Sequence, residues 1–111
     1  MARFVTIGYG DAEGYERTDQ QLLDAAHADD ARQRKAGVVM GVAGVPVQVR
    51  NPSGAGVERS EGPYGRAPLP LAGFSIIEAD SLDEAVEIAG RAPCAIAEGV
   101  VEVWPLLDTP G

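Results

Sequence analysis

Residues 73–85 read GFSIIEADSLDEA, and this stretch decides how the rest of the chain is interpreted. Its first half is rich in β-branched and aromatic residues, which predicts a strand over residues 72–79. Ser81 and Glu84 then form a capping box, in which each side chain can satisfy a free backbone N–H at the start of a helix. Apolar residues recur at helical spacing after that point, up to Pro93. A strand that runs directly into a helix indicates a protein that contains both kinds of element.

The first third of the chain has the same order. Residues 4–9 mix β-branched and aromatic side chains, which predicts a first strand. Thr18 and Gln21 have capping-box spacing and predict a helix over residues 19–36, which Gly37 ends. After the first two turns the apolar residues of this helix are alanines only. Its second half is therefore expected to pack thinly or to be solvated.

The remaining segments complete a sheet. Residues 38–42 form an apolar run typical of a strand covered on both faces. Residues 45–50 and 55–60 flank the turn sequence NPSG at 51–54, which predicts a hairpin closed by a type I turn. Residues 100–104 form the last strand. The hairpin is an insertion and is expected to lie outside the core.

The predicted order is strand, helix, strand with a hairpin, strand, helix, strand. This is the split βαβ or ferredoxin-like pattern of an α+β protein. The 111 residues suffice for one domain, so residues 1–111 are expected to form a single unit. Two helices can cover only one face of the sheet, and we expect a second copy of the chain to cover the other face. The sequence therefore predicts a homodimer.

The composition argues against several classes of partner. Nine Lys and Arg against seventeen Asp and Glu give a net charge of −8. Nucleic acids and anionic membranes are not expected as partners, because both need clustered cations. No apolar run approaches the roughly 20 residues of a membrane span, and the N-terminus does not resemble a signal peptide. We therefore expect a cytoplasmic protein.

Few residues offer metal or nucleophilic chemistry. His27 is the only histidine, which excludes a His-rich metal site. Asp11, Glu13 and Glu16 cluster after the first strand, and we interpret them as a solvated loop. The single cysteine, Cys94, is interpreted as a small buried apolar residue. No metal and no cofactor are expected.

Four passages together resemble the YCII-related family, in particular its branch named for an Asp-Gly-Pro-Phe motif. They are residues 4–10, 61–64, 73–85 and 100–106, which span nearly the whole chain. Residues 61–64 read EGPY, so Glu and Tyr replace the Asp and Phe of the namesake motif. The resemblance implies a dimeric α+β barrel, in which two ferredoxin-like sheets pack face to face around a polar-lined cleft.

The resemblance also bounds the function. Relatives include a dehydrochlorinase that acts on a chlorinated hydroquinone, and some members lie beside sigma factors or are fused to them. In the branch with a proposed His–Asp pair, the histidine lies on the first helix, as His27 does. Counted back from Gly37, His27 lies about one residue from the position that this pairing implies. An exposed helix histidine between Asp24 and Asp30 is the alternative interpretation.

The last strand carries the leading catalytic candidate. Side chains alternate along a strand, so Val101 and Val103 share one face while Glu102 and Trp104 share the other. If the valines pack under the helices, Glu102 points into the cleft beside an indole. A partly desolvated carboxylate there suits a general acid or base. On the first strand, Thr6 is expected to face the same cleft, and the alternative for Glu102 and Trp104 is a solvated carboxylate beside a dimer-sealing indole.

Two hypotheses for the function follow. The first is a cofactor-independent lyase, isomerase or cyclase acting on a small molecule, with Glu102 and His27 as acid–base groups and Trp104 shaping the pocket. The second is a non-catalytic ligand-binding or regulatory module that serves a transcription-related partner. In either case three loop residues are expected to cover the mouth of the cleft, namely Glu61, Tyr64 and Arg66. Convergence of Glu102, His27 and Tyr64 on one concave pocket would separate the hypotheses, because without it the enzyme hypothesis loses most of its support.

Overall fold

The computed structural model describes residues 1–107, which contain a four-stranded antiparallel sheet. Its strands lie in the order β2-β5-β1-β6, so the first and third strands of the ferredoxin-like pattern are central. Their bounds are Ala2–Tyr9 for β1, Val39–Val42 for β2, Leu71–Ala79 for β5 and Val100–Pro105 for β6. The chain is therefore an α+β protein with the predicted ferredoxin-like topology.

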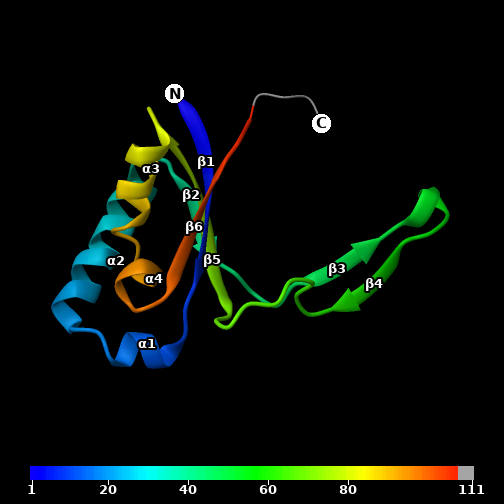
Figure 1. Ribbon diagram of the computed structural model, residues 1–111, viewed down its shortest axis with the longest axis horizontal. Helices are drawn as coiled ribbons and strands as arrows, with labels where there is room; N and C mark the ends of the chain where they lie inside the picture. Colours follow the sequence, from blue (N-terminus) through cyan, green and yellow to red (C-terminus); the bar gives the residue numbers. More distant parts are fainter. Residues whose placement is uncertain (108–111) are drawn as a thin grey trace.

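The four α-helices that the structure describes lie on one side of this sheet (Figure 1). The two long ones are α2, Gln20–Lys35, and α3, Leu82–Ala89. Two shorter ones, α1 at Ala12–Glu16 and α4 at Pro93–Ile96, were not predicted from the sequence. No helix within residues 1–107 is long and apolar enough to cross a membrane.

The helix boundaries depend on local capping. The Ser81 side chain accepts a hydrogen bond from the Glu84 N–H at 3.1 Å, as the capping box predicts. The prediction for α2 was wrong by one residue, because Asp19 is the N-cap and accepts from the Gln21 N–H at 2.8 Å. Thr18 instead donates to the Gly14 carbonyl. The helix α2 thus forms where the sequence predicts it, but its N-cap is Asp19 and not Thr18.

The hairpin forms a separate two-stranded sheet. Its strands are β3, Val47–Arg50, and β4, Glu58–Glu61, joined through the short 3₁₀ helix η1, Pro52–Gly54. The turn closes with a hydrogen bond from the Gly54 N–H to the Asn51 carbonyl. It is not the predicted type I turn, because Ser53 has a φ of 56°. In Figure 1 the hairpin projects from the side of the main sheet that carries no helices.

The core lies between the helices and one face of the main sheet. Phe4, Ile77, Ala79 and Ala85 form its buried cluster, and Val103 packs against it. The pairing register explains this arrangement, because Phe4 lies opposite Ile77 and residues that face one another across a pair share a side of the sheet. The helix-facing side of β6 is therefore the valine side, as expected.

The opposite side of the sheet, here called the open face, is apolar and uncovered. Phe74 is 53% exposed and Trp104 is also 53% exposed. The register places eight apolar or aromatic residues on it, namely Val5, Ile7, Tyr9, Val39, Phe74, Ile76, Val100 and Trp104. Such a continuous apolar surface is unusual on a monomer.

One close approach of two backbones sets the spacing of β2 and β5. A Cβ on Gly73 would lie 2.4 Å from the Gly41 carbonyl oxygen, whereas a Cβ on Gly41 would meet nothing within 4 Å. We expect Gly73→Ala to lower the free energy of unfolding by about 1–3 kcal/mol, because the strands must shift. Gly41→Ala is the matched control and should change it little. Urea unfolding measures both, and equal losses would contradict the account.

Candidate functional site

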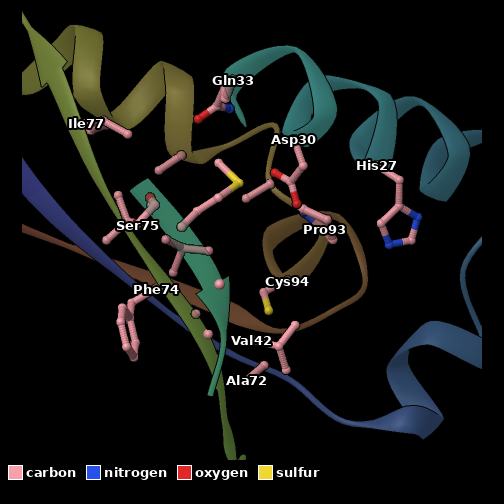
Figure 2. A pocket seen from close by; sticks show the side chains of 18 of the residues that line it. His27, Asp30, Gln33, Val42, Ala72, Phe74, Ser75, Ile77, Pro93 and Cys94 are labelled. Atoms are coloured by element: carbon pink, nitrogen blue, oxygen red, sulfur yellow. The ribbon is translucent and has the colours of Figure 1, made fainter. Parts of the chain in front are cut away.

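A cavity of about 270 Å³ lies between α2, α4 and the helix-facing side of the sheet (Figure 2). We call it the α2 pocket. Its walls are mainly apolar and include Met40, Val42, Ile77 and Ile88. The polar or ionisable residues that line it are Thr6, Tyr15, His27, Asp30, Gln33, Arg34, Ser75 and Cys94.

The floor of the α2 pocket is made by β1 and β5. Gly8 and Gly73 pair with each other there and place no side chain on that part of the floor. A Cβ on Gly8 would lie 3.0 Å from the Cys94 sulfur, so this position has no room to spare. Beside the glycines, the hydroxyls of Thr6 and Ser75 hydrogen-bond to each other. The floor thus offers one paired hydroxyl group to a ligand in an otherwise apolar setting.

The roof of the pocket is the second half of α2, which is anchored by a buried carboxylate. Asp29 is 9% exposed and accepts hydrogen bonds from Arg32 and Gln33, each at 2.9 Å. Arg91, just after α3, lies 3.8 Å from the same carboxylate. The contacts of Arg32 and Gln33 lie within α2, and the Arg91 contact links α2 to the end of α3. They also orient Gln33, which lines the pocket.

Asp30 is the carboxylate that reaches the α2 pocket, and Figure 2 shows its side chain directed toward Pro93 and Cys94. Burial raises the pKa of the Asp30 carboxyl above its ordinary value, while the positive charges of Arg34 and of protonated His27 act in the opposite direction. His27 lies one helical turn earlier, at the side of the pocket. Its ring stacks on Tyr15 with a centroid distance of 6.4 Å.

Tyr15 and Cys94 close the pocket near α1 and α4. The Tyr15 hydroxyl lies 4.0 Å from the Cys94 sulfur. Burial raises the pKa of the Tyr15 phenol to about 12, and burial also raises the pKa of the Cys94 thiol. Both groups are therefore protonated at neutral pH. A neutral thiol is a poor nucleophile, which agrees with the interpretation of Cys94 as a packing residue.

The predicted catalytic residues do not converge. Glu102 pairs with Ile7 and lies on the open face, on the other side of the sheet from His27. Tyr64 is 78% exposed at the base of the hairpin, where its ring lies 5.6 Å from the Arg50 guanidinium carbon. Glu102, His27 and Tyr64 therefore do not converge on one pocket, and the enzyme hypothesis built on Glu102 loses most of its support. Convergence fails because β6 and α2 present these groups to opposite sides of one sheet.

Two further expectations concerned single positions. Thr6 was expected on the same face as Glu102, and this was wrong, because the register pairs Thr6 with Val103 on the helix side. Glu61 is the last residue of β4 and Arg66 follows in the connection to β5, and both are exposed. Neither residue lines the α2 pocket.

Glu102 belongs to a polar cluster on the open face. The Tyr9 hydroxyl donates to the Glu102 carboxylate at 2.9 Å, and the Trp104 indole N–H donates to the same oxygen at 3.4 Å. This hydrogen bond to Glu102 raises the pKa of the Tyr9 phenol. Trp104 does lie beside Glu102, as the strand alternation predicts. The cluster lies among apolar side chains and does not line the α2 pocket.

The comparison with known families agrees with the observed topology. A family model described as the YCII-related domain matches residues 2–109. The chain belongs to the YCII-related family. A comparison with curated proteins gives no match. For this YCII-related chain, residues 1–107 contain no group of three or more His, Cys, Asp or Glu residues placed to hold a metal ion.

Sequence reasoning missed most of the polar residues of this YCII-related pocket. Asp30 was noted only as a neighbour of His27, although its spacing of three residues puts both on one side of the helix. Ser75 is the one polar residue among the inward positions of β5, where it alternates with Phe74 and Ile76. Because both faces of β5 are apolar, alternation alone did not identify the inward face.

The raised pKa of Asp30 gives a stability prediction. A folded pKa above the unfolded value of about 3.9 means that the native state holds this proton more tightly than the unfolded chain does. Ionised Asp30 therefore destabilises the fold at pH 7, and the penalty fades as pH falls through the folded pKa. Asp30→Asn should leave the free energy of unfolding at pH 7 unchanged or raised, and the difference should disappear near pH 3.

Asp24→Asn is the matched control, because it removes the same charge from the exposed side of the same helix. Urea unfolding at pH 7, 5 and 3 measures all three proteins. A clear loss of stability in Asp30→Asn at pH 7, absent from Asp24→Asn, would show that ionised Asp30 is stabilised by a partner and is not penalised by burial.

Proposed function

We propose that this protein binds a small, largely apolar molecule in the α2 pocket and moves a proton on it. The reaction class is that of a cofactor-independent lyase or isomerase. One observation carries the proposal: a half-buried carboxylate with a raised pKa, Asp30, lines an apolar cavity beside the only histidine of the chain. Groups whose pKa is moved toward the working pH are the ones that transfer protons efficiently.

The lining of the pocket indicates the class of ligand. Met40, Val42 and Ile88 offer an apolar surface to a ring or a short hydrocarbon body. The hydroxyls of Thr6 and Ser75 lie on the floor and offer a hydrogen bond to a carbonyl or hydroxyl group. A cavity of about 270 Å³ is at the small end of ligand pockets, which commonly measure about 300–1,000 Å³. Small phenols, lactones and hydroxy acids fit this description.

Asp30 is the acid–base group in the proposal, and His27 is the second. Asp30 supplies the carboxylate that accepts a proton from the ligand, and the neighbouring charge of Arg34 helps it to return to the ionised state. His27 lines the same pocket, and its imidazole is the second acid–base group of the proposal. Glu102 has no part in this chemistry, because it lies on the open face.

A non-catalytic role is the second candidate, as a ligand-binding or regulatory module for a transcription-related partner. Two observations favour it. The residues first expected to perform catalysis do not meet, and the walls of the α2 pocket are mainly apolar. A pocket of this kind binds a ligand through burial of apolar surface and needs no reacting group. The two candidates differ in whether Asp30 exchanges protons with the ligand.

The proposal also includes a homodimer in which two open faces pack against each other. Its support is the exposure of apolar residues on a complete face of the sheet, among them Phe74, Ile76 and Trp104. Burial of apolar surface stabilises by roughly 25 cal/mol per Å². In such a dimer the Tyr9–Glu102–Trp104 cluster, which joins β1 to the edge strand β6, is part of the interface. The hydrogen bonds to Glu102 there satisfy a carboxylate that loses water.

Proton transfer can be tested without knowledge of the natural substrate. Small phenols, lactones and hydroxy acids are first screened by thermal shift, because a ligand that binds only the native state raises the melting temperature. Each compound that binds is then incubated with the protein in D₂O, and ¹H NMR follows the replacement of its acidic C–H protons by deuterium. We expect exchange with the unmodified protein and a loss of at least 100-fold in its rate with Asp30→Asn, while the thermal shift is retained.

Glu102→Gln is the matched control and should exchange as fast as the unmodified protein. Binding without any exchange would contradict the enzymatic proposal and leave the non-catalytic one. Loss of exchange in Glu102→Gln but not in Asp30→Asn would place the chemistry on the open face.

A further inference from the structure

Residues 45–66, here called the arm, contact little of their own chain. Four of their valines are exposed: Val45 by 85%, Val57 by 66%, Val49 by 65% and Val47 by 44%. An isolated two-stranded hairpin is at best marginally stable in water. The arm therefore needs a covering surface that its own chain does not provide.

The valines of the arm lie on one face. Val47 pairs with Glu61 and Val49 pairs with Arg59, so these four residues share one side of the hairpin. Val57 precedes Arg59 by two positions and falls on the same side in an extended chain. Along the arm runs a shallow groove, lined by Pro46, Val47, Gln48, Val49, Arg50, Gly62 and Tyr64. The arm thus presents a row of exposed valines, with the charged side chains of Arg59 and Glu61 on the same face.

The size of the exposed surface points to a second copy as the partner. The chain exposes 7999 Å², whereas a compact monomer of 11.6 kDa exposes about 5,800 Å². Its radius of gyration is 16.0 Å, against about 13 Å for a compact domain of this length. The excess of area is of the size that each partner buries in a large obligate interface. Within residues 1–107, neither the open face nor the arm is covered.

The charge of the arm and the direction in which it projects both agree with a second copy of the chain as the partner. The arm holds three arginines and two glutamates, a net charge of +1, while the rest of the chain holds six cations and fifteen carboxylates, a net charge of −9. The arm is thus complementary to the body of another copy. It projects from the side of the sheet that bears the open face, into the space that a second copy covering that face must occupy (Figure 1).

We propose that the arm is a dimerisation arm, whose valine face packs along the body of a second copy of this chain. By two-fold symmetry each copy sends its arm across the other. The inference rests on the proposed face-to-face dimer and adds a second contact to it. The arm then stabilises the assembly, while the fold of each chain remains independent of it.

Sedimentation equilibrium of the full chain tests the proposal with two classes of variant. Val47→Thr/Val49→Thr keeps β-branched side chains but removes apolar surface, and we expect a dimer dissociation constant raised at least tenfold with an unchanged circular dichroism spectrum. Ser60→Ala, on the opposite side of the hairpin, is the matched control and should leave the constant unchanged. Ile76→Glu places a charge on the open face and should give a monomer, whereas Leu22→Glu, on exposed α2, should not.

Photocrosslinking locates the arm directly. An unlabelled chain that carries benzoylphenylalanine in place of Val57 is mixed with ¹⁵N-labelled chain and irradiated. Mass spectrometry then distinguishes cross-links within one chain from cross-links between chains. We expect cross-links from the arm to the labelled partner. If the valine double variant dimerises as tightly as the unmodified chain and the cross-links are all within one chain, the proposed role of the arm is wrong. The face-to-face dimer then still stands. A monomeric unmodified chain at 100 µM overturns both.

Discussion

A four-stranded sheet with helices on one side only is the constraint on which the rest of this structure depends. The helices bury the side of β1 and β5 that carries Phe4 and Ile77, and this burial forms the core. The other side is equally rich in apolar residues but has no layer above it. Because a sheet is stable only when its apolar face is covered, the fold of a single chain is incomplete as a layered structure. The proposed homodimer and the proposed dimerisation arm both answer this one requirement.

The α2 pocket arises from a mismatch on the covered side. The first half of α2 buries Leu23 and Ala26, and α2 packs mainly against α4. In the second half polar side chains follow, Asp30 and Gln33 among them, and below them the sheet has glycines at positions 8 and 73. Because the sheet has glycines here and α2 has polar side chains, no apolar side chain fills the space between them. Elsewhere in the core this space is closely packed. The core is therefore not closely packed at this place, and a gap in the packing is what a ligand site requires.

Much of the fold could be predicted from the sequence, because its signals are local. The capping box at Ser81, the glycine that ends α2 and the alternation in β6 each act within a few residues, and all three are found in the structure. The short helices α1 and α4 were not predicted. Helices of four or five residues have too few positions to show a period, and α1 depends on an N-cap contact from Asp11 to the Gly14 N–H.

The site could be predicted only in part, because it depends on which side of the sheet each strand presents. Glu102 and Trp104 were correctly placed together, but Thr6 was placed on their face, one step out of register with its neighbours. A strand that is apolar on both sides, such as β5, gives no sign of which side the helices cover. His27 was recognised as a candidate, whereas the role of Asp30 depends on partial burial that no sequence pattern reveals.

The location of the ligand is the central claim, and a ¹H–¹⁵N NMR titration tests it most directly. The protein is titrated with the small phenol or lactone that gives the largest thermal shift, and the shifts of the backbone amides are mapped on the structure. The account predicts the largest changes at Asp30, Gly41, Gly73 and Cys94, which surround the α2 pocket. Changes confined to Ile7, Glu102 and Trp104, on the open face, would contradict it.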